Sequence, residues 1–76
     1  MDFEKMKSII ANVLNIDPTG ITRETTLVED LGADSLDVLQ VIMEIEEEYG
    51  VEIPTEMEDT LVTVGDAYDK IKTVIK

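Results

Sequence analysis

Neither cysteine nor histidine occurs in this 76-residue chain, so no disulfide and no Cys/His metal site can stabilise its fold. A chain this short buries only a modest share of its surface, and packing of apolar side chains has to decide the fold. We expect one domain over residues 1–76, and the missing cysteines are typical of a cytoplasmic protein. The first residues, Met1 to Glu4, have neither a basic leader nor an apolar stretch, so no targeting segment is expected.

Apolar residues recur at helical spacing in two long segments. The first follows Asp2, which is suited to cap it, and should end near Asn15, before the turn-forming residues 17–20. The second is expected from about Ser35 to Tyr49, because Gly50 follows where a glycine commonly ends a helix.

Two capping patterns predict further helices nearer the C-terminus. Residues 55–58, Thr-Glu-Met-Glu, match a capping box and predict a short third helix, and residues 63–66, Thr-Val-Gly-Asp, open a fourth in a related way. The sequence therefore predicts an all-α fold: a small four-helix bundle with a long first loop and a short third helix. The fourth helix should bury Val64, Ala67, Tyr68, Ile71, Val74 and Ile75, and the first loop should be pinned to the core by Ile16, Ile21, Leu27, Val28 and Leu31.

The helix expected after residue 35 carries two apolar stripes instead of one. On a helical wheel of about 100° per residue, five residues form the face expected in the core: Val38, Val41, Ile42, Ile45 and Tyr49. Leu36, Leu39 and Met43 form a second stripe, displaced by roughly 130° on the same wheel. Gln40, Glu46 and Glu47 flank this stripe, which indicates a docking surface unless another part of the chain covers it.

Ser35 is expected in the first turn of that helix, with Asp34 as the cap. Unpaired backbone N–H groups and the positive end of the helix dipole collect there, so a phosphate on the Ser35 hydroxyl would be favoured. A serine at a helix start is more often structural, and the local pattern alone leaves both readings open.

The wider sequence around Ser35 narrows that choice. Residues 28–37 read Val-Glu-Asp-Leu-Gly-Ala-Asp-Ser-Leu-Asp, three glutamates follow at 46–48, and Glu-Ile-Pro stands at 52–54. Over essentially the whole chain, this pattern closely resembles the acyl carrier proteins of bacterial-type (type II) fatty-acid synthesis. The resemblance implies a non-catalytic carrier that holds growing acyl chains as thioesters on a 4′-phosphopantetheine, joined to Ser35 by a phosphodiester. It also implies that a separate phosphopantetheinyl transferase installs this group from coenzyme A.

The same resemblance assigns further site residues by position. The partner-binding residues would be Asp34, Leu36, Asp37, Leu39, Met43, Glu46 and Glu47. An acyl pocket would be lined by Leu27, Val28, Ile45, Ile53, Leu61 and Ala67. Two positions depart from the family pattern: Gln40 stands where an acid is usual, and Leu27 where an aromatic residue is common.

Charge is segregated along the chain. Eighteen acids and six bases give a formal net charge of −12, and no base lies between Glu24 and Asp69. All the acids except Asp2, Glu4 and Asp17 lie within that segment. Such a surface repels nucleic acids and anionic membranes and suits enzymes with basic docking patches, although acids can also serve solubility alone. We expect a monomer that binds no nucleic acid and does not insert into membranes.

Other functions agree less well with the sequence than a carrier does. A nucleophilic serine needs a base, and the usual histidine is missing, so we expect no enzyme. A calcium-binding loop beginning at Asp30 would require a glutamate where Val41 stands, so no metal site is expected. A carrier dedicated to another pathway, such as polyketide assembly, and an unmodified acidic protein-interaction domain both stay open as alternatives.

Overall fold

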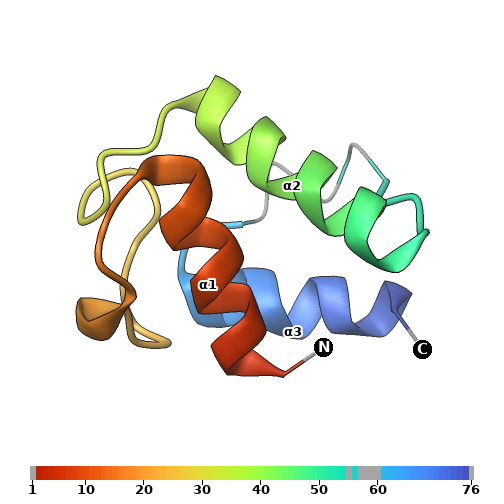
Figure 1. The fold of residues 1–76 in the computed structure, drawn as a ribbon, viewed down its shortest axis with the longest axis horizontal. Helices are drawn as coiled ribbons and strands as arrows, with labels where there is room; N and C mark the ends of the chain where they lie inside the picture. Colours follow the sequence, from red (N-terminus) through yellow and green to blue (C-terminus); the bar gives the residue numbers. More distant parts are fainter. Residues whose placement is uncertain (1, 55, 57–60, 76) are drawn as a thin grey trace.

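Three α-helices and one short 3-10 helix make up the fold in the computed structural model, which describes residues 2–54, 56 and 61–75 (Figure 1). Their order is α1 (Phe3–Leu14), η1 (Pro18–Gly20), α2 (Ser35–Tyr49) and α3 (Val64–Val74). The long connection between α1 and α2 fills the left side of the view in Figure 1. The all-α prediction is confirmed. The fourth helix of the prediction is α3. Apart from residue 56, the predicted short third helix at 55–58 lies outside the described residues.

The helix ends follow the capping chemistry that the sequence predicts. Asp2 caps α1 by accepting a hydrogen bond from the Lys5 amide at 2.8 Å. Reciprocal capping boxes begin α2 and α3, and Gly50 ends α2 in the left-handed region at φ 65°. The left-handed residue after α1 is Asn15, at φ 58°, a conformation that asparagine tolerates better than most side chains. The predicted bounds of α1 and α2 are therefore confirmed.

Hydrogen bonds hold the long connection in two places. After α1, the Asp17 carboxylate accepts hydrogen bonds from the amide and hydroxyl of Thr19, and these bonds lower the pKa of Asp17. Further along, backbone hydrogen bonds join the connection to the start of α3 through residues 23 and 65, 25 and 64, and 27 and 62. Gly65 permits this approach, because a Cβ atom there would lie 2.9 Å from the Arg23 carbonyl oxygen.

Side-chain contacts reinforce the attachment of this connection to α3. The Arg23 guanidinium forms an ion pair with Asp69 at 2.6 Å and lies 5.9 Å from the ring centres of both Phe3 and Tyr68. The two rings meet edge to face at 5.5 Å. Arg23, the one base in the connection, therefore ties it to both α1 and α3.

One apolar core joins all three helices. Its most deeply buried members are Met6 and Ile10 of α1, Ile45 of α2, and Val64 and Ile71 of α3. Among the residues that the structure describes, no polar or charged side chain is buried. Apolar packing thus supplies the stability, as the missing cysteines and histidines require.

The expected core faces of α2 and α3 are present, with graded burial. Val41, Ile42 and Ile45 of α2 are buried, and Val38 and Tyr49 are half-buried against the core. On α3, Val64, Ala67 and Ile71 are buried, while Tyr68, Val74 and Ile75 are partly buried. Within the described ranges, no helix has both the length and the apolar character needed to cross a membrane.

Candidate functional site

Ser35 is the first residue of α2, and its side chain is exposed. The capping box next to it uses two carboxylates: Asp34 accepts from the Asp37 amide at 2.9 Å, and Asp37 accepts from the Asp34 amide at 3.2 Å. Across the described part of the chain, no hydrogen bond involves the Ser35 hydroxyl or the amides of Ser35 and Leu36. The hydroxyl is therefore accessible, and two first-turn N–H groups point from the positive end of α2 with no partner there. This arrangement fits a phosphate ester on Ser35.

The residues before Ser35 form a compact turn. Residues 28–31 make a single turn that ends on Gly32 at φ 70°, and the Gly32 amide donates to the Val28 carbonyl at 3.0 Å. Ala33 then enters the core, with its amide donating to the Leu27 carbonyl at 2.9 Å. Val28 lies on the outer side of this turn and is 63% exposed. The expectation that Val28 pins the loop to the core is wrong, whereas Ile21 and Leu27 are buried and Ile16 and Leu31 pack against the core.

The second apolar stripe of α2 is left exposed by the residues that the structure describes. Leu36 is 73% exposed, Leu39 40% and Met43 55%. Together with Gln40, Glu44 and Glu47, these residues line an open groove of about 400 Å³ on the outer side of α2. We call this surface the outer face of α2. It begins one residue after Ser35, so a partner bound there would be beside the serine hydroxyl.

Three of the acids predicted to bind partners, Asp34, Asp37 and Glu46, also accept hydrogen bonds within the chain. The Glu46 carboxylate accepts from the Ile53 amide at 2.8 Å, which ties the segment after α2 back to the helix. Asp37 belongs to the capping box of α2. Glu47, which lines the groove, has no hydrogen bond or ion pair to any described residue.

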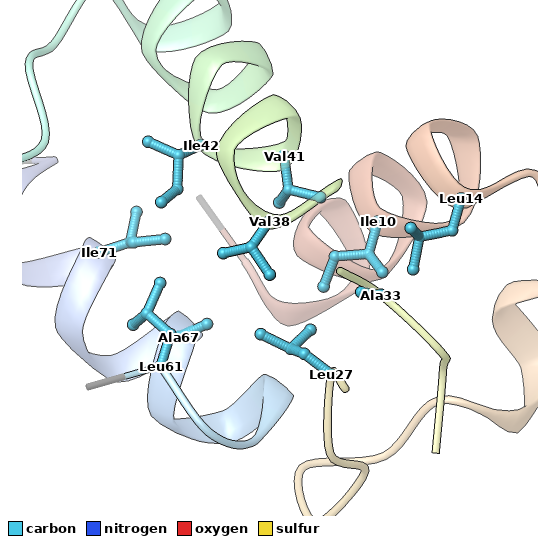
Figure 2. Close-up of a pocket in the computed structure, with 10 residues that line it drawn as sticks. All are labelled: Ile10, Leu14, Leu27, Ala33, Val38, Val41, Ile42, Leu61, Ala67 and Ile71. Carbon is cyan, nitrogen blue, oxygen red and sulfur yellow. The ribbon is translucent and has the colours of Figure 1, made fainter. Parts of the chain in front are cut away.

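A small apolar cavity of about 10 Å³ lies between the helices (Figure 2). That is about the smallest volume that can hold one water molecule. Figure 2 shows ten side chains converging on it from α1, α2, α3 and the intervening segments: Ile10, Leu14, Leu27, Ala33, Val38, Val41, Ile42, Leu61, Ala67 and Ile71. Every wall is hydrocarbon, so the cavity suits an aliphatic group and no polar one.

Three of the six residues predicted around an acyl pocket line this cavity, namely Leu27, Leu61 and Ala67. Ile45 and Ile53 are buried in the same core but are not among the lining residues, and Val28 faces solvent. The sequence-based assignment missed the α1 side, Ile10 and Leu14. Their helical periodicity marks them as core residues and carries no signal that separates a cavity wall from the rest of the core.

The described residues contain no cluster of three acidic side chains arranged to hold a metal ion. The acids of α2 occupy positions 37, 44 and 46–48 of the helix.

Comparisons with known proteins agree on one family. Residues 4–71 match the protein family described as "Phosphopantetheine attachment site". An acyl carrier protein of Clostridium acetobutylicum is 49% identical over 72 residues, which cover 95% of this chain and 94% of that protein. One from Helicobacter pylori is 49% identical over 70 residues, covering 92% and 90%. A solved structure from Mycobacterium tuberculosis, described as a candidate acyl carrier protein, superimposes with a TM-score of 0.86 at 37% identity, covering 93% of this chain and 95% of that one.

Proposed function

Because the chain belongs to the acyl carrier protein family, we propose that Ser35 is the residue that bears its 4′-phosphopantetheine. The protein is a non-catalytic carrier of the fatty-acid synthesis type with this group covalently attached. When bound, the group supplies a terminal thiol on which an acyl chain is held as a thioester. The observation that carries the assignment is the exposed Ser35 hydroxyl at the first residue of α2, where the capping box leaves two amides without partners among the described residues.

The direct test is to locate the modification. The apo protein would be incubated with coenzyme A, Mg²⁺ and a phosphopantetheinyl transferase, and its intact mass measured. We expect a gain of one phosphopantetheine, and peptide mapping should place it on the peptide that contains Ser35. A gain located on any other residue would contradict the assignment.

We further propose that the outer face of α2 is where the transferase and the synthetic enzymes bind. Support comes from three exposed apolar side chains, Leu36, Leu39 and Met43, bordered by Glu44 and Glu47. An apolar strip within an acidic border favours partners with a basic patch around an apolar contact. Asp34, Asp37 and Glu46 complete the proposed surface, although all three also accept hydrogen bonds that stabilise the carrier itself.

Met43→Ala tests this face. Since the Met43 side chain is 55% exposed, its truncation should change the free energy of unfolding by less than about 0.5 kcal/mol. Binding to a partner enzyme should nevertheless weaken, by about fivefold or more if Met43 contributes over 1 kcal/mol to the interface. The measurements are a denaturant titration and a binding isotherm. Unchanged affinity would remove Met43 from the docking surface.

Salt should move folding and binding in opposite directions. The chain carries a formal net charge of −12, and its acids repel one another more strongly in the compact state than in the unfolded state. Added salt or millimolar divalent cations should therefore raise the melting temperature, while the association rate with a basic partner should fall. A melting curve and a stopped-flow rate across one salt series at neutral pH measure both. A melting temperature that stays flat or falls would show that repulsion does not limit stability.

We propose a single carrier domain over residues 1–76 that functions as a monomer in the cytoplasm. The three residues Leu27, Leu61 and Ala67, which line the cavity, support an acyl pocket there. Because the cavity is no larger than one water molecule, an acyl chain would have to enlarge it by parting the helices.

A further inference from the structure

Thr26 and Asp30 hold each other across the turn that precedes Ser35. The Thr26 amide donates to Asp30 Oδ2 at 2.9 Å, and the Asp30 amide donates to Thr26 Oγ1, also at 2.9 Å. This is the reciprocal pattern of a capping box, here spaced four residues apart and closing a single turn. Asp30 is therefore held in place by two hydrogen bonds, although it lies in an exposed acidic segment.

The other end of the same turn is closed by backbone hydrogen bonds. Leu31 donates to the Thr26 carbonyl at 3.2 Å, and Gly32 and Ala33 donate to the carbonyls of Val28 and Leu27. Gly32 adopts φ 70°, the left-handed conformation with which a helical turn commonly ends. Residues 26–33, which we call the 26–33 turn, are thus capped at both ends.

The 26–33 turn is fixed to the core at two points. Leu27 and Ala33 are both buried, both line the cavity, and Leu27 also donates a backbone hydrogen bond to the Val62 carbonyl at 3.0 Å. Ala33 is followed by Asp34, the cap of α2, and then by Ser35. Few backbone torsions separate the last anchored residue from the serine, so the geometry of the turn sets where the Ser35 hydroxyl is presented.

We propose that Thr26 and Asp30 are positioning residues for the modification of Ser35. They keep the 26–33 turn closed, so that the hydroxyl meets the phosphopantetheinyl transferase in one conformation. This inference rests on the proposed function of Ser35. If the turn opens, only a fraction of molecules presents the serine correctly, and the apparent affinity of the transferase falls in proportion to that fraction.

A charge effect has to be separated from this positioning effect, because Asp30 is also one of the exposed acids. Asparagine can accept the same hydrogen bond from the Thr26 amide through its side-chain oxygen, so Asp30→Asn removes the charge and keeps the bond. Asp30→Ala removes both. Glu29→Gln is the charge control, because it removes one negative charge from the residue before Asp30. The Glu29 side chain is exposed and has no hydrogen bond or ion pair to any described residue.

The experiment measures KM and kcat of the transferase with each full-length apo carrier. We expect Asp30→Ala and Thr26→Val to raise KM for the carrier by about 3- to 10-fold with kcat within about twofold, the range that loss of a capping bond represents. The Asp30→Asn variant should have the same KM as Glu29→Gln, which has the same net charge. The Thr26→Ser variant should have the KM of the wild type. In Asp30→Ala and Thr26→Val, amide hydrogen exchange at Gly32 and Ala33 should accelerate by a similar factor. The α2 amides around Ile45 should keep their protection in both variants.

Two results would overturn the inference. An Asp30→Asn variant as impaired as Asp30→Ala would assign the effect to charge. Complete loss of amide protection at Gly32 and Ala33, which means that the turn is open in most molecules, together with a wild-type KM would show that closure of the turn does not matter for modification. Thr26→Val supplies a second route to the same opening if Asp30→Ala unfolds. Wild-type protein that gains no mass on Ser35 would instead contradict the proposed function, so the two failures are distinguishable.

Discussion

Ser35→Ala is expected to gain no mass when the apo protein is incubated with coenzyme A, Mg²⁺ and a phosphopantetheinyl transferase. The phosphodiester needs the Ser35 hydroxyl oxygen, and alanine offers no atom in its place. The effect is all or none, which makes it the largest that we expect from a single substitution. Intact-mass spectrometry before and after the incubation measures it.

The fold should tolerate this change, because the Ser35 side chain is exposed and makes no hydrogen bond to any described residue. Alanine is also a good helix former, so the free energy of unfolding should stay within about 0.5 kcal/mol of the wild-type value. Ser8, the only other serine, lies exposed on α1, and Ser8→Ala serves as the matched control that still gains the full mass. A Ser35→Ala protein that is loaded like the wild type would place the attachment elsewhere.

Ile45→Ala should destabilise the fold by about 2–5 kcal/mol, the usual cost of truncating a buried isoleucine. Ile45 is fully buried on the inner face of α2 and belongs to the core cluster. Small domains have total stabilities of about 5–15 kcal/mol, so this loss is a large part of what holds the chain folded. Urea denaturation followed by circular dichroism measures it.

Met43→Ala is the control for Ile45→Ala, because it truncates a large apolar side chain on the same helix, two residues away and on the outer face. Ile45→Val, which removes one methyl group, should cost about 0.5–1.5 kcal/mol. This order of stabilities follows from burial alone. Equal losses in Met43→Ala and Ile45→Ala would mean that the outer face of α2 is packed in solution.

The helices could be predicted from the sequence because their signals are local. Asp2, Gly50 and the Thr63–Asp66 box each act within one helical turn of the end that they cap, and the predicted positions are confirmed. The second apolar stripe of Leu36, Leu39 and Met43 could also be identified from the sequence, but the sequence left open whether another part of the chain covers it, and the structure shows all three side chains exposed.

The remaining features depend on contacts between distant parts of the chain. The antiparallel bridge between Thr26 and Thr63 joins isolated residues and leaves no periodic pattern in the sequence. Val28 is apolar yet faces outward, because the 26–33 turn rotates it away from the buried Leu27 beside it. The bond from Ile53 to Glu46 could not be foreseen for the same reason: it spans seven residues and a change of chain direction.

The core without buried polar side chains has a consequence for how the helices can move. Directional bonds between buried polar groups fix one arrangement of packed helices, and rearranging them leaves partners unsatisfied. Among the described residues, the contacts around the cavity are instead between hydrocarbon surfaces, whose attraction depends on area and hardly on angle. An aliphatic chain pushed between α1, α2 and α3 would therefore break no side-chain hydrogen bond in the described core. It would exchange one set of hydrocarbon contacts for another, so side-chain bonding in the described core would not oppose swelling of the interior around a proposed guest.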